Sequence, residues 1–92
     1  MELTILKTTI KEEYGKAGKN YATLIVNDTE IGYITDEGIF LRLYNPGTPF
    51  GVLDKVATGE KKQFFQYCQF IEKHWSAIYD RYDLLIKKGM EI

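Results

Sequence analysis

Cys68, His74 and Ser76 are the residues of this chain that could supply a nucleophile and a base, and they lie close together in the sequence. Such a pair must reach hydrogen-bond distance. Cys68 and His74 are six positions apart in a segment with helical spacing, which places them on helix faces about 120° apart. The residues three and four positions from His74 are all apolar, so no local carboxylate would orient its ring. We therefore predict a protein that is not an enzyme.

Two other segments could be mistaken for sites. The sequence GKAGK at residues 15–19 lacks the spacing of a phosphate-binding loop and precedes a strand, so it is typical of a solvated hairpin loop. Glu12 and Glu13 are adjacent, and alternation in an extended segment points them to opposite faces. With a single cysteine and a single histidine, no disulfide and no zinc-ligand spacing is present. We expect no cofactor and no metal.

The length and composition of the chain predict one domain over residues 1–92, with 45% hydrophobic and 14% aromatic residues. Twelve Lys and Arg against thirteen Asp and Glu give a net charge of −1, which favours neither nucleic acid nor an acidic membrane as a partner. The N-terminal sequence MELTILKTTIKEE lacks the pattern of a signal peptide, and no apolar stretch is long enough to span a membrane. The expected location is the cytoplasm, without a membrane partner.

The elements expected to position any site are four strands and one helix. Alternation and β-branched residues predict strands over residues 3–10, 21–26, 30–35 and 39–44. Asn27 and Asp28 tolerate the positive φ of a tight hairpin, and Gly38 supplies the left-handed position that ends a longer turn. Strands joined in this way predict an antiparallel meander, and residues 45–58, with two prolines, predict an irregular link.

A long helix is predicted over residues 59–88, with Thr58 as its N-cap and Gly89 as its C-cap. At 1.5 Å per residue it would be about 43 Å long, so it should bend, break once or protrude. Its apolar stripe, at spacings of four and three, is expected to cover one face of the sheet and gives an α+β fold. The stripe consists of Phe64, Cys68, Ile71, Trp75, Ile78, Tyr82 and Leu85.

Four further rings in the helix exceed what this stripe requires, namely Phe65, Tyr67, Phe70 and Tyr79. They either pack at the margin of the core or contact a partner, which could be a second copy of the chain. Alternation in the sheet offers a second candidate surface, with Tyr33, Phe40 and Tyr44 on the outer face beside Arg42. These rings could equally interleave with the first strand or with the link.

Charge is unevenly distributed, because the sheet half is acidic and the helix half is mildly basic. We expect the acidic residues of the sheet to steer the chain toward a basic partner, such as an enzyme that handles nucleic acid. These residues are Asp28, Glu30, Asp36 and Glu37. The alternative is binding of single-stranded RNA or DNA through cations and a stacking ring. The candidates for that role are Lys16, Lys19, Lys61, Lys62 and Tyr21.

In size and character the chain resembles the small inhibitors and immunity factors of phages and mobile elements, including anti-CRISPR proteins and antitoxins. The features shared with them are the small size, the missing catalytic constellation and the surplus of aromatic residues. This resemblance implies an inhibitor or regulator that docks on a larger protein. The sequence as a whole predicts a protein-interaction module, with nucleic-acid binding as the alternative.

Overall fold

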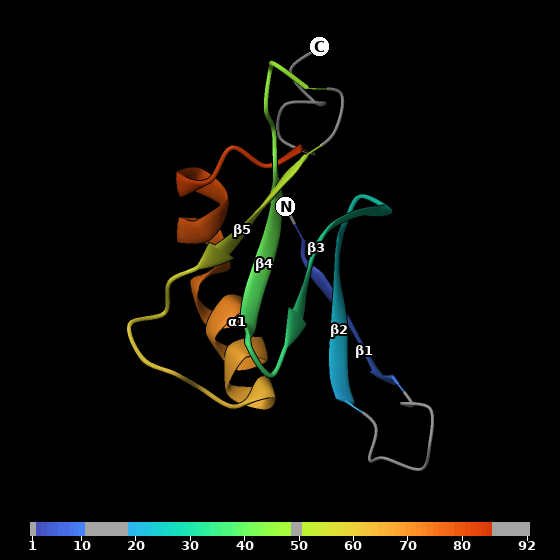
Figure 1. Cartoon of the computed structure of the whole chain (residues 1–92), viewed down its shortest axis with the longest axis vertical. Coiled ribbons are helices and arrows are strands. Elements are labelled where there is room, and N and C mark those ends of the chain that lie inside the picture. Colours follow the sequence, from blue (N-terminus) through green and yellow to red (C-terminus); the bar gives the residue numbers. More distant parts are fainter. Residues whose placement is uncertain (1, 11–18, 49–50, 86–92) are drawn as a thin grey trace.

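A five-stranded antiparallel sheet packs against one C-terminal helix in this computed structural model, which describes residues 2–10, 19–48 and 51–85, without the side chains of Thr9 and Ile10 (Figure 1). The strands lie side by side in chain order. The predicted α+β fold, with an antiparallel sheet and a C-terminal helix, is therefore confirmed. The elements are β1 (Thr4–Ile10), β2 (Lys19–Val26), β3 (Thr29–Thr35), β4 (Gly38–Leu43), β5 (Val52–Val56) and α1 (Phe64–Arg81).

The fifth strand corrects the predicted four-stranded sheet. β5 lies within residues 45–58, which were expected to form an irregular link, and it pairs with β4 from Leu43 opposite Val52 to Ile39 opposite Val56. Its sequence, VLDKV, is short and follows two prolines and two glycines. Apolar and polar residues do not alternate regularly along β5, and Val56 is its one buried residue.

The predicted tight hairpin at residues 27 and 28 is confirmed. Asn27 and Asp28 have φ values of 51° and 61°, the pair of left-handed positions that a two-residue hairpin loop requires. Gly38, with φ of 148°, ends the second hairpin, as expected. An added Cβ at Gly38 would also lie 2.7 Å from the Lys55 side chain, which passes over this glycine.

The strand register divides the sheet into two faces. One row of paired residues runs through Ala22, Ile34, Ile39 and Val56, and all four are buried beneath the helix. The next row faces the opposite side, because neighbouring residues of a strand alternate. A β-bulge between β2 and β3 interrupts this alternation: Leu24 pairs with Gly32, but Ile25 pairs with Glu30. The extra residue, Ile31, is thereby fully buried.

The helix is shorter than predicted. It begins at Phe64 with Gln63 as N-cap, whereas residues 59–63 lie outside it, and Gly59 has a left-handed φ of 88°. The predicted N-cap Thr58 instead donates a hydrogen bond from its hydroxyl to the Glu60 carbonyl. The helix ends at Arg81 rather than 88, and the predicted C-cap, Gly89, lies outside the described residues. Within the helix, His74 has φ of −108° and ψ of 15°, which makes a kink.

The core lies between this helix and the sheet. Five members of the predicted stripe are buried: Phe64, Cys68, Ile71, Trp75 and Ile78. After the helix, the chain returns to the end of β4, where the Tyr44 N–H donates to the Asp83 carbonyl and Leu84 is fully buried. The helix covers one face of the sheet, so the site must be sought on the other face, on the outer side of the helix or at the sheet ends (Figure 1).

Candidate functional site

A ladder of three rings crosses the face of the sheet opposite the helix. Tyr33 and Phe40 are direct cross-strand partners, and their ring centroids are 5.1 Å apart. Tyr21 stacks on the other side of Tyr33 at 5.5 Å. All three rings are partly exposed. We call this side of the sheet the open face, and define it by the residues that share it: Leu6, Tyr21, Ile25, Glu30, Tyr33, Phe40, Arg42, Leu53 and Lys55.

Exposed apolar residues extend the ladder toward both edges of the sheet. One continuous row of paired residues runs from Leu6 through Thr23, Tyr33 and Phe40 to Lys55. Leu6 in β1 is 57% exposed, and Leu53 in β5, the partner of Arg42, is 43% exposed. Apolar and aromatic side chains are thus partly exposed on this face of the sheet, interspersed with Thr23, Arg42 and Lys55.

One ion pair lies on the open face. The bulge turns Glu30 to this side, where its carboxylate lies 3.5 Å from the Arg42 guanidinium. Burial raises the pKa of Tyr21, and the charge of Glu30 and the hydroxyl of Tyr33 add to that increase while Arg42 opposes it. These influences place the Tyr21 hydroxyl in the same cluster as the ion pair. The open face thus combines rings with a balanced pair of charges.

The predicted sheet rings are only partly brought together. Tyr33 and Phe40 are in contact, as the alternation suggested, and Arg42 lies on the same face. Tyr44 follows the last residue of β4 and is 42% exposed. Sequence reasoning missed Leu6 and Leu53 as members of this surface, because the open-face register depends on the bulge and on the unpredicted β5.

The four surplus rings of the helix divide into three groups. Tyr67 is 3% exposed and belongs to the core, where its hydroxyl accepts a hydrogen bond from the Lys62 backbone N–H at 3.1 Å. Of the two predicted alternatives, this burial favours core packing over a partner contact for Tyr67. Phe70 and Tyr79 are partly buried against the core, with ring contacts to His74 and Trp75 respectively. Phe65 is 53% exposed.

The acidic candidates do not form one patch. Asp28 lies in the turn before β3, whereas Asp36 and Glu37 form the turn after it. Seven residues of strand separate these turns, which at about 3.3 Å per residue is about 23 Å. Glu30 is engaged with Arg42 on the open face. Any steering of a partner by these acids would therefore act at two separate ends of the sheet.

The candidates for nucleic-acid binding are also dispersed. Lys16 lies outside the described residues. Lys19 and Tyr21 share a cavity of about 260 Å³ with Asp36 and Glu37, whose carboxylates would repel phosphate. Lys61 and Lys62 lie on the segment that leads into the helix. Among the described candidates, Lys19 and Tyr21 line one cavity while Lys61 and Lys62 line another.

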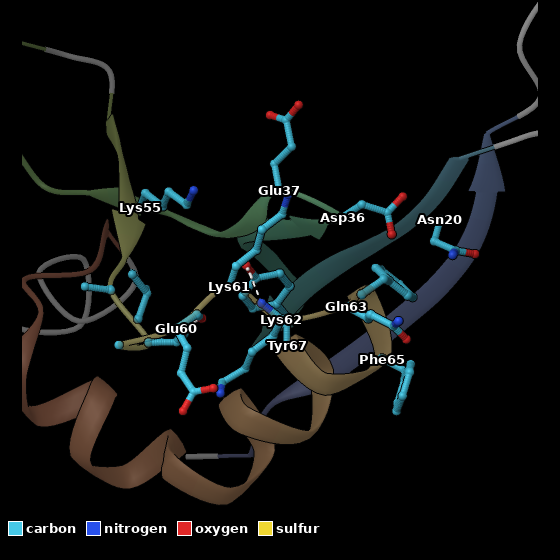
Figure 2. A pocket seen from close by; sticks show the side chains of 15 residues that line it. Asn20, Asp36, Glu37, Lys55, Glu60, Lys61, Lys62, Gln63, Phe65 and Tyr67 are labelled. Atoms are coloured by element: carbon cyan, nitrogen blue, oxygen red, sulfur yellow. Dashed lines mark hydrogen bonds between the residues drawn. The ribbon is translucent and has the colours of Figure 1, made fainter.

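A cavity of about 1230 Å³ opens between the β3–β4 turn, the end of β5 and the start of the helix (Figure 2). Three lysines, Lys55, Lys61 and Lys62, are balanced there by three carboxylates. Figure 2 shows the Asp36 and Glu37 side chains pointing away from each other. The lining of this cavity contains no His, Cys or Ser.

Cys68 and His74, the residues with the most reactive side chains, are separated as their spacing predicts. Cys68 is buried in the core, and burial raises the pKa of its thiol, with smaller opposing effects that include Lys7. His74 is exposed, and its ring lies 4.6 Å from that of Phe70. Within the described residues, no three His, Cys, Asp or Glu side chains are placed to hold a metal ion.

In the part of the chain that the structure describes, no helix combines the length and apolar character needed to cross a membrane. Comparisons of the chain with protein-family models, with curated proteins and with solved structures found no match.

Proposed function

We propose that this chain is a protein-interaction module that binds a larger protein through the open face of its sheet. The observation that carries the proposal is that each of the five strands contributes a partly or largely exposed apolar or aromatic side chain to the open face, namely Leu6, Tyr21, Tyr33, Phe40 and Leu53. Aromatic residues and arginine are enriched at the centres of protein interfaces. The ladder and Arg42 provide both at the centre of this face.

The arrangement of the rings favours a protein over a nucleic acid. Single strands bind by stacking their bases on the faces of aromatic side chains. Here Tyr33 is stacked on both sides, by Tyr21 and by Phe40, so its ring faces are already occupied. What the ladder offers a partner is ring edges and adjacent aliphatic side chains. Such a surface suits apolar side chains and backbone carbonyls.

The Glu30 and Arg42 pair supplies specificity. A partner that covers these charges must compensate for the water they lose, since burying an ion pair without new hydrogen bonds is costly. A partner with a polar group placed against Arg42 meets that requirement, and a purely apolar one does not. The pair thereby restricts what can bind next to the rings.

The mode of action that fits this surface is occupancy. The chain would cover part of its partner and block access to it, as small inhibitors do, without transforming a substrate. Five strands about 4.8 Å apart and about 20 Å long give a face of roughly 480 Å² in projection. The accessible area of a textured face is larger, so the open face approaches the roughly 800 Å² per partner of a standard interface.

Site-specific photo-crosslinking tests the proposal. A photoreactive phenylalanine analogue is placed at Leu53 on the open face or, as the matched control, at Phe65 on the helix, which is similarly exposed. Each protein is irradiated in the source cell, and crosslinked products are identified by mass spectrometry. We expect a defined protein adduct from position 53 and none of the same identity from position 65.

A Tyr33→Ser, Phe40→Ser variant carrying the same probe at position 53 should lose the adduct while its circular dichroism shows a folded chain. An adduct from position 65 alone would reject the open face as the contact surface. A crosslink to RNA or DNA in place of a protein would establish the alternative function, and crosslinks only to a second copy of the chain would show that the face mediates self-association.

A further inference from the structure

A second surface lies on the outer side of α1, where the helix contacts no strand. Its groove has a volume of about 290 Å³. The residues that line it are Lys62, Gln66, Gln69, Phe70, Lys73 and His74. Lys62 lies just before the helix, and the helical members of the lining share one side of it, away from the buried stripe that contains Cys68 and Ile71.

The groove is cationic and contains no carboxylate among its lining residues. Lys62 and Lys73 lie near its two ends, and the side-chain amides of Gln66 and Gln69 lie between them. The nearby helix acids, Glu72 and Asp80, are not part of the lining. Lys62 also lines the larger cavity that contains Glu60, but the lining of this groove itself carries two lysines and no carboxylate, which favours an anionic partner.

Local contacts hold the groove residues in place. The Lys62 backbone N–H donates to the Tyr67 hydroxyl, which anchors the segment that carries this lysine against the buried side of the helix. The Gln66 side-chain oxygen accepts a hydrogen bond from the Gln63 N–H at 2.9 Å. At the other end, the kink at His74 accompanies a tilted contact of its ring with that of Phe70.

From this arrangement we propose that the outer groove of α1 is a docking site for an acidic peptide segment. Lys73 is nine residues beyond Phe64, the first helical residue, which is about 14 Å along the helix, and Lys62 lies just before that start. An extended peptide covers that distance with about five residues at 3.3 Å each. Carboxylates near the ends of such a segment meet the two ammonium groups, and the glutamine amides face its backbone.

The same features disfavour a nucleic acid in this groove. Phe70 is the one aromatic carbocycle that lines it, and its ring is partly buried and contacted by His74. A base would therefore find no free ring face to stack on. Amides and ammonium groups along a shallow groove match an acidic peptide better.

The proposal is independent of the open face, because the two surfaces lie on opposite sides of the molecule with the core between them. Its probe is a fluorescein-labelled octaglutamate peptide, followed by fluorescence anisotropy at low and at physiological ionic strength. Octalysine and a short oligothymidine carry the same label for comparison. We expect octaglutamate to bind and the affinity to fall as salt is added.

Charge reversal locates the site. The Lys62→Glu, Lys73→Glu variant should bind octaglutamate at least about tenfold more weakly than the natural chain. The matched control, Lys7→Glu and Lys19→Glu, makes the same change in net charge on β1 and β2 and should retain most of the binding. The Lys62→Arg, Lys73→Arg variant keeps the charges and should bind as the natural chain does.

Three results would overturn the proposal. The first is no binding of octaglutamate at low ionic strength. The second is an equal loss of binding in the groove variant and in the control, which would assign the affinity to total charge. The third is tighter binding of oligothymidine than of octaglutamate with the same dependence on Lys62 and Lys73, which would make the groove a nucleic-acid site.

Discussion

Gly32 shows how a single residue controls the separation of two strands. It lies beside the bulge in β3 and pairs with Leu41 of β4. A Cβ at this position would collide with the backbone carbonyl oxygen of Phe40, an atom that cannot move without shifting β4. We predict that Gly32→Ala lowers the free energy of unfolding by about 3 kcal/mol, measured by urea denaturation.

Gly47→Ala is the control for that substitution. An added Cβ at Gly47 meets only the Asn45 side-chain oxygen, at an ordinary contact distance of 3.5 Å. We expect this variant to differ from the natural chain by less than about 0.5 kcal/mol. Similar losses in both variants would show that the close approach of β3 and β4 at Gly32 has been relieved in solution.

The buried thiol of Cys68 predicts a pH dependence of stability. Burial raises the pKa of this thiol in the folded chain, so the unfolded chain releases the proton first as the pH increases. Stability from this group is therefore complete below the ordinary thiol pKa and is lost as the pH rises above it. We expect the free energy of unfolding to fall more steeply between neutral and alkaline pH in the natural chain than in Cys68→Ala.

Parallel curves for the two proteins would contradict this prediction. Tyr21, whose pKa is also raised, is present in both proteins, so its contribution cancels in the comparison. Cys68→Ala itself should cost stability at every pH because it leaves a small cavity beneath the helix. Only the difference between the two proteins in the slope of unfolding free energy against pH reports the ionisation of the thiol.

At the scale of elements, the β2–β3 hairpin depends on two residues in the left-handed region. Asp28 has φ of 61°, which glycine adopts without the steric cost that a side chain carries. We predict that Asp28→Gly raises the free energy of unfolding by about 0.5 kcal/mol and that Asp28→Ala lowers it by about 1 kcal/mol. Urea denaturation of both variants gives the comparison, and the opposite order would refute the role assigned to the turn.

The sequence allowed most of the sheet and the core stripe to be predicted, because these depend on local patterns. The alternation of β2 and the pair Asn27–Asp28 specify their own structure. β5 could not be predicted in this way, since four of its five residues are exposed and its strand conformation comes from pairing with β4. β5 can be identified only once its pairing with β4 is known.

The start of the helix and the candidate surfaces also depend on contacts that local sequence patterns do not reveal. Thr58 and Glu60 are typical of a helix N-terminus, but the helix begins at Phe64, where the Gln63 and Gln66 hydrogen bond forms. Tyr67 lies three residues after Phe64 and four before Ile71, which places it beside the core stripe, and it is buried with its hydroxyl accepting a hydrogen bond from the Lys62 backbone N–H. The open face depends on the bulge, which places Glu30 beside Arg42.

At the scale of the whole molecule, the single helix produces two different outer surfaces. It buries one side of the sheet and leaves the other to the ring ladder, while its own outer side carries Lys73 and the segment just before it carries Lys62. A second layer on the open face would be needed to complete a sandwich. Within the described residues, no further helix or strand covers the open face.

The one-sided packing also predicts how stability is distributed. β3 and β4 are paired on both edges and contain the fully buried Ile34, Ile39 and Leu41, whereas β1 pairs only with β2 and its Ile5 is partly exposed. We therefore expect amide hydrogen exchange, followed by mass spectrometry, to be slowest in β3, β4 and the centre of α1 and fastest in β1. Equal protection of β1 and β4 would show instead that the sheet opens only as a whole. If a partner covers the open face, its addition should slow exchange in β1 and β5 most, since these edge strands have the most protection to gain.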